Sequence, residues 1–106
     1  MKMYIAVLDE FPDYMTPTLV AHTVLGAHLK FQEDGHYNNW LRMYFKKVTV
    51  RVNQKEFDKI AALPNVYIGY EKNTLDGKPS CVVTYTKLTE ELPNVLKFAK
   101  LWKPKE

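Results

Sequence analysis

The histidines are the residues of this sequence whose type best suits acid–base or ligand chemistry. His22 follows the segment Thr16-Pro17-Thr18, which is typical of a helix start with Thr16 as the N-cap and Pro17 in the first turn. A histidine little more than a turn from the positive end of a helix can act as a general base or bind an anion. We therefore take His22 as the candidate catalytic residue and Thr16 and Thr18 as candidate ligand contacts. A half-buried histidine with a purely structural role is the alternative.

Neither a metal site nor a cysteine nucleophile is predicted. His22 and His28 are six residues apart, whereas two metal-binding histidines on one helix are four apart, and no carboxylate with ligand spacing accompanies them. Cys81 lies in an apolar run, where a buried thiol is expected, and as the single cysteine it has no disulfide partner within the chain. We expect no metal and no other cofactor.

A second candidate site is the segment from Tyr37 to Lys47, which interleaves aromatic and basic residues. Exposed aromatic rings beside Arg42, Lys46 and Lys47 would stack on nucleic-acid bases while the cations contact phosphates. The same aromatics in residues 37–45 would also suit docking on a protein partner. A third reading places the aromatics in the core, with the lysines as their solvated flank. All three remain open from the sequence.

The composition is that of an ordinary globular chain. Its 106 residues are 46% hydrophobic and 25% charged, with a formal net charge of +3, which suits one domain spanning 1–106. That charge permits a polyanionic partner without requiring one. No stretch approaches the ~20 apolar residues of a membrane span. We therefore expect no membrane partner, and we expect a cytoplasmic location. The oligomeric state stays open, a homodimer included.

The hydrophobic pattern predicts alternating strands and helices. The apolar run 3–8 suits a central strand covered on both faces, and the period-two pattern of 47–52 predicts another strand. Asn53 and Glu56 have the spacing of a capping box and so begin a helix. The pattern also predicts strands at 66–70 and 81–86, helices at 17–31, 40–45 and from Thr89 to Trp102, a loop at 32–39 and a frayed tail from Lys103.

The order of these elements is strand, helix, short helix, strand, helix, strand, strand, helix. Strand–helix–strand alternation implies parallel neighbours joined by right-handed crossovers, whereas the turn at Asp76-Gly77 joins the last two strands as an antiparallel pair. We therefore predict an α/β fold: a three-layer α/β/α domain with a four-stranded mixed sheet.

Several segments of the chain resemble the peptidyl-tRNA hydrolases of the archaeal and eukaryotic type. The likeness covers nearly the whole chain in element order, and its most specific point is Ala21-His22 in the first helix. The other matching segments are Asn39-Trp40-Leu41 before the second strand, the strand that runs into Asn53, and Ile68 to Glu71 at the end of the third strand. The resemblance implies a fold that handles tRNA, with His22 in the catalytic position.

The departures from that family concern its catalytic residues. Met15 stands in place of a lysine, Leu19 in place of a glutamine, and Lys72 in place of an aspartate. Thr74 is the second matching position beside His22. Because ester hydrolysis needs a positioned base or water and a group that stabilises the oxyanion, we expect the fold without efficient hydrolysis.

The sequence thus predicts a non-catalytic or weakly catalytic peptidyl-tRNA-hydrolase-like domain that binds tRNA or a tRNA-associated protein. The further ligand contacts expected are Lys72, Thr74, Arg42, Lys46 and Lys47. Two alternatives remain: a divergent peptidyl-tRNA hydrolase or esterase with His22 as its base, and a protein interaction module that docks through residues 37–45.

Overall fold

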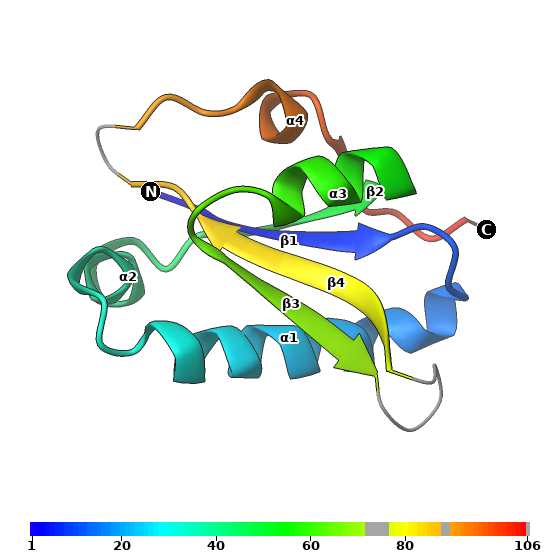
Figure 1. The fold of residues 1–106 in the computed structure, drawn as a ribbon, viewed down its shortest axis with the longest axis horizontal. Coiled ribbons are helices and arrows are strands. Elements are labelled where there is room, and N and C mark those ends of the chain that lie inside the picture. The colour runs from blue at the N-terminus through cyan, green and yellow to red at the C-terminus, as the bar shows by residue number, and fades with distance from the viewer. Residues whose placement is uncertain (72–76, 88–89, 106) are drawn as a thin grey trace.

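A computed structural model describes residues 1–71, 77–87 and 90–105 of the chain. Within these residues the fold is mixed α/β, with one five-stranded mixed sheet in the order β3-β4-β1-β2-β5 and four α-helices (Figure 1). The strands are β1 Met3–Leu8, β2 Lys47–Val52, β3 Val66–Glu71, β4 Lys78–Tyr85 and β5 Lys100–Leu101. The helices are α1 Thr16–Phe31, α2 Gly35–Asn39, α3 Gln54–Ala61 and α4 Asn94–Lys97.

β1 is the central strand, as its continuous apolar run predicts. It pairs in parallel with β2 and antiparallel with β4, and all six of its residues are buried. Because successive strand residues point to opposite faces, Tyr4 and Ala6 belong to one hydrophobic cluster and Met3 and Ile5 to another. α3 and α4 cover the first face, and α1 and α2 cover the second (Figure 1).

α1 crosses β3 at very short range. A Cβ atom added to Gly69 would lie 2.0 Å from the Thr23 Oγ1 atom, and one added to Gly26 would lie 2.5 Å from the Tyr67 ring. Thr23 is buried on α1, and its hydroxyl donates to the carbonyl oxygen of Leu19 at 2.8 Å. The two glycines therefore set the distance between helix and strand, because no larger residue fits without a shift.

The predicted four-strand count is wrong because the last segment adds a strand to the sheet. Within residues 90–105 the α-helix covers only Asn94–Lys97, and Lys100–Leu101 then pairs antiparallel with Val50 and Arg51. The backbone of this segment pairs with an edge of β2 that a longer helix would leave open. Thr89, the predicted start of the helix, lies outside the described residues.

The predicted cap of α1 is also wrong. The chain already turns in a 3-10 helix, Asp13–Met15, and the N-cap position of α1 is Met15, with no side-chain cap hydrogen bond. The Met15 N–H donates to the carbonyl oxygen of Pro12, and the Thr16 N–H to that of Asp13. Because these donors are already paired, the helix start needs no side-chain cap.

The segment predicted as a loop contains α2. Its N-cap is Asp34, whose Oδ1 atom accepts the N–H of His36 at 2.8 Å. Asn39, which precedes the next turn, has a helical backbone, and its side chain makes no cap hydrogen bond. The chain continues from α2 into a single π-helical turn, Trp40–Tyr44, instead of the short α-helix expected there.

Candidate functional site

His22 and Thr18 lie four residues apart on the outer face of α1, and both side chains are exposed. Thr16 is instead buried, at 7% exposure, so the structure does not bring the three predicted contacts onto one surface. The predicted ligand contacts Lys72 and Thr74 lie outside the described residues. Over the residues that the structure describes, the exposed His22 imidazole has no water-excluding environment of the kind that general-base catalysis uses.

The second predicted site is an exposed turn built on a buried tryptophan. We call residues 40–47 the basic aromatic turn. Trp40 is 1% exposed, and its Nε1–H donates to the carbonyl oxygen of Lys46 at 2.8 Å. The Phe45 ring stacks on Trp40, with centroids 5.6 Å apart, yet Phe45 is 57% exposed. Met43 and Tyr44 are exposed beside it, so part of the aromatic segment is core and part is surface.

Three cations flank these exposed side chains. Arg42, Lys46 and Lys47 are all exposed, as predicted for ligand contacts. Lys47 Nζ lies 3.1 Å from the centroid of the Phe45 ring and donates to the Phe45 carbonyl oxygen at 2.7 Å. Within the described part of the chain, the charged groups of Arg42 and Lys46 make no hydrogen bond or ion pair. The turn thus presents two uncompensated cations next to exposed apolar side chains.

Phe45 adopts a backbone conformation that bulky residues rarely take. Its φ of 59° and ψ of 11° are left-handed, and it is the one non-glycine residue with positive φ in the described ranges. The strain of such a residue is about 1–3 kcal/mol and persists where surrounding contacts fix it. Here the Phe45 N–H donates to the Trp40 carbonyl oxygen at 2.7 Å, and the ring stack adds to that. Strain of this kind concentrates at binding and catalytic sites.

A partly buried hydrogen bond supports the turn from the sheet. The Tyr85 hydroxyl on β4 donates to the Asp34 Oδ2 atom, which fixes the residue that begins α2. That hydrogen bond is the main reason why the pKa of Asp34 lies below its ordinary value of 3.8. Burial, with Asp34 adding to it, raises the pKa of Tyr85 far above its usual range. Tyr37 Oη also lies 2.9 Å from His28 Nδ1, which joins α2 to α1.

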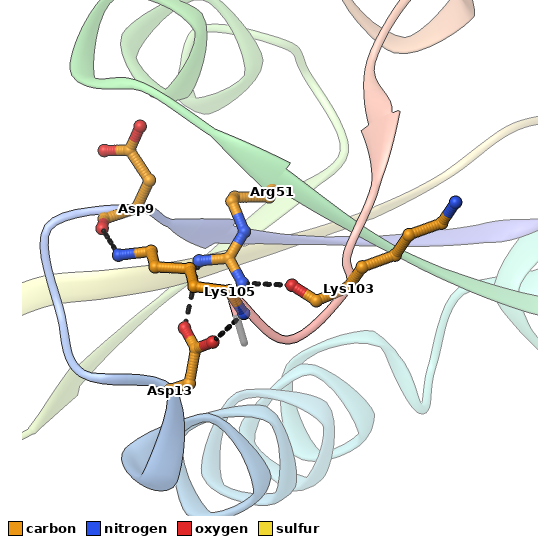
Figure 2. A network of polar contacts seen from close by, with 5 residues as sticks. All are labelled: Asp9, Asp13, Arg51, Lys103 and Lys105. Atoms are coloured by element: carbon orange, nitrogen blue, oxygen red, sulfur yellow. Dashed lines mark hydrogen bonds and ion pairs between the residues drawn. The ribbon is translucent and has the colours of Figure 1, made fainter.

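A polar network at the carboxyl ends of β1 and β2 was not predicted from the sequence (Figure 2). Arg51 forms an ion pair with Asp13 at 3.1 Å and donates to the carbonyl oxygen of Lys103. The Lys105 N–H donates to Asp13 Oδ2 at 2.6 Å, and Lys105 Nζ to the carbonyl oxygen of Asp9 at 3.0 Å. The Lys105 N–H, with help from Arg51, lowers the pKa of Asp13. The tail predicted to be frayed is therefore held against the domain through residue 105.

Cys81 has the inert environment that the sequence predicts. It is fully buried on β4, and burial raises the pKa of its thiol to about 12, against the smaller opposing effect of the Thr23 side chain. A thiol with that pKa stays protonated at neutral pH and is a poor nucleophile.

The described residues hold no group of three or more His, Cys, Asp or Glu side chains that could bind a metal ion. Over the same residues, no helix has the length and apolar character that crossing a membrane requires.

Comparison with known proteins adds nothing to this geometry: no protein-family model matches the chain, and no curated protein matches it significantly. Function is therefore inferred from the described side chains. Of the predicted contacts, Arg42, Lys46 and Lys47 are all exposed on the basic aromatic turn, whereas Thr16 is separated from Thr18 and His22 by burial.

Proposed function

We propose that this protein is a peptidyl-tRNA-hydrolase-like domain that binds RNA, of the tRNA class, through its basic aromatic turn without efficient hydrolysis. The observation that carries the proposal is the exposure of Met43, Tyr44 and Phe45 beside the uncompensated charges of Arg42 and Lys46. The tRNA class comes from the family resemblance of the sequence.

Exposed rings next to free cations favour unpaired nucleotides over duplex RNA. Unpaired bases stack on aromatic side chains, whereas the bases of an A-form helix are inaccessible to such rings. The Phe45 ring is already fixed on Trp40, so little side-chain entropy is lost on binding, and a base that stacks on the face covered by Lys47 displaces that ammonium group. Arg42 and Lys46 would then contact the phosphates that flank the stacked bases.

The exposure of His22 supports a binding role over a hydrolytic one. A divergent esterase would need His22 to activate water beside a group that stabilises the oxyanion. Met15 and Leu19, at the start of the same helix, supply no polar group for either purpose. Binding without turnover requires neither a general base nor a group that stabilises an oxyanion from these residues.

The experiment is a filter-binding titration of a tRNA with a single-stranded 3′ end, repeated over a range of salt concentrations. Phe45→Gly removes the ring at a position whose φ of 59° glycine adopts without strain. Since stacking contributes about 1–3 kcal/mol per base, affinity should fall roughly tenfold. Arg42→Gln with Lys46→Gln should reduce the salt slope by about 1.4, which is two phosphate contacts to a single strand.

The matched control is Lys55→Gln with Lys59→Gln, which removes two exposed cations from α3. If the control weakens binding as much as the changes in the turn, the RNA is attracted by net charge alone and the proposed surface is wrong. Single-turnover cleavage of a peptidyl-tRNA by the wild type and by His22→Ala should give the same background rate. A faster wild type would support the esterase instead.

A further inference from the structure

The carboxyl ends of β1 and β2 form a crevice of the kind where α/β sheets bind small molecules. β1 and β2 are neighbours and parallel. The helix after β1, α1, packs on one face of the sheet, and the helix after β2, α3, packs on the other (Figure 1). Parallel neighbours whose connections diverge in this way leave a crevice beyond their carboxyl ends, and ligands bind in it.

A pocket of about 500 Å³ occupies this crevice. Asp9, directly after β1, and Asn53, directly after β2, line it, and β5 closes one side. Its volume lies in the range typical of small-molecule sites, about 300–1,000 Å³. Its position and size are those that small-molecule sites have in α/β sheets.

One lysine in the pocket wall is assigned to an anion. Lys100 and Lys103 both line the pocket, and within the described part of the chain neither ammonium group makes a hydrogen bond or ion pair. Figure 2 shows the Lys103 side chain extending away from the Asp9 side chain, so the ligand is assigned to Lys100. Arg51 also lines the pocket, but its charge is paired with Asp13 and it donates to the Lys103 carbonyl oxygen. An unpaired ammonium group suits the oxygens of a phosphate group.

The other walls offer a ring and carboxylates. Phe98 is 72% exposed and lines both this pocket and a neighbouring one of about 430 Å³, with Lys97 Nζ 5.6 Å from its ring centroid. The Asp9 side chain points away from the polar network in Figure 2, although its carbonyl oxygen belongs to that network. Glu56 also lines the pocket, but one of its oxygens already accepts the Asn53 N–H in the capping box. Asp9 therefore provides the free acceptor.

We propose that this pocket binds a nucleoside monophosphate. Lys100 binds the phosphate, the Asp9 carboxylate accepts the ribose hydroxyls, and the base stacks on Phe98. A phosphate, a hydroxyl-bearing sugar and an aromatic base are the three groups for which the walls provide partners. The site is separate from the basic aromatic turn, because β2, with six residues at about 3.3 Å each, lies between them.

The test is an NMR titration of the isotope-labelled full chain with adenosine monophosphate, guanosine monophosphate, adenosine and inorganic phosphate. The monophosphates should shift the amides of Phe98, Lys100 and Asp9 in a saturable manner. Adenosine and inorganic phosphate should bind at least about tenfold more weakly, because each lacks one of the required groups. Lys100→Gln should reduce monophosphate affinity by about tenfold, and Phe98→Leu should reduce preference for the nucleotide over phosphate.

Lys46→Gln is the control, since it removes a cation from the basic aromatic turn and should leave nucleotide binding unchanged. Equal affinity for inorganic phosphate and the monophosphates would overturn the proposal, because the pocket would then be a simple anion site. Shifts confined to residues 42–47, or no saturable shift, would overturn it too. The tRNA titration with Phe45→Gly is independent of these results, so either proposal can fail alone.

Discussion

The Tyr85→Phe substitution removes one buried hydroxyl and should loosen the support of the basic aromatic turn. Tyr85 is 1% exposed, and its hydroxyl donates to Asp34 Oδ2. The other Asp34 oxygen accepts the His36 N–H and begins α2, from which the turn continues. Phenylalanine keeps the ring contacts with Phe31 and Tyr37, whose centroids lie 5.2 and 5.7 Å away. The change therefore isolates the hydrogen bond.

The expected loss in the free energy of unfolding follows from the charge on Asp34. A hydrogen bond to a charged group contributes about 1.5–3 kcal/mol. Asp34 is only partly buried, so water can replace the lost donor in part, and we expect about 1–2 kcal/mol near neutral pH. An effect of that size should also weaken RNA binding, because α2 positions the turn.

The pH dependence of this loss identifies its origin. The Tyr85 hydroxyl is the largest cause that lowers the pKa of folded Asp34 below 3.8. A lowered pKa stabilises the fold fully above the unfolded pKa, and the contribution is lost as pH falls through the folded pKa. The difference between the wild type and Tyr85→Phe should therefore be largest at neutral pH and shrink once the pH falls below the ordinary value of 3.8.

Urea unfolding of both proteins, near neutral pH and at about pH 3, measures this difference. Tyr4→Phe is the matched control, because Tyr4 is also buried, at 9% exposure, and its hydroxyl makes no hydrogen bond within the described residues. The control should change stability by less than about 0.5 kcal/mol. If Tyr85→Phe lost the same stability at both pH values, the hydroxyl would not act through the Asp34 carboxylate, and the reasoning would fail.

Two further predictions concern the packing between α1, β3 and β4. Gly69→Ala should lower the midpoint of urea unfolding, at a cost of about 1–3 kcal/mol from overpacking, because the new Cβ would lie 2.0 Å from Thr23 Oγ1. A midpoint equal to that of the wild type would contradict this close approach of α1 to β3. Cys81, with a thiol pKa of about 12, should react with a thiol reagent only as fast as the protein unfolds, and rapid modification of the native protein would contradict its burial.

Much of the fold could be predicted because its signals are local. The period-two pattern of 47–52 gives the bounds of β2, and the Asn53–Glu56 capping box begins α3 as expected, with hydrogen bonds of 2.8 and 2.9 Å. The buried strand β1 is likewise identified by a run of consecutive apolar residues. Each of these elements depends on residues within a few positions of one another, so a pattern is sufficient to identify it.

The features that could not be predicted depend on contacts between distant residues. Lys100 and Leu101 form a strand because β2 has an open edge, and Lys105 is held by Asp13, 92 positions away. No local sequence pattern identifies partners that are so far apart in the chain. α1 poses a related problem, since Leu25 and Leu29 are as apolar as its buried residues yet are exposed. The spacing of apolar residues along α1 therefore could not show whether the His22 side chain is buried or exposed.

The basic aromatic turn combines features that could be predicted from the sequence with features that could not. The exposure of Arg42, Lys46 and Lys47 follows from their charge, and the sequence predicts it. Which aromatic rings are exposed depends instead on the π-helical turn and the left-handed Phe45, which no residue preference indicates, since phenylalanine disfavours positive φ.

The two proposed sites lie at opposite ends of β2 and depend on different supports. The turn is held by the Tyr85–Asp34 hydrogen bond and by Trp40, whereas the pocket wall is held by Arg51, which joins Asp13 to the chain after β5. These supports share no residue. A change at Tyr85 should therefore weaken RNA binding and leave the pocket intact, and a change at Arg51 should do the reverse. If both changes weakened both kinds of binding, one continuous surface along the β2–β5 edge would replace the two separate sites.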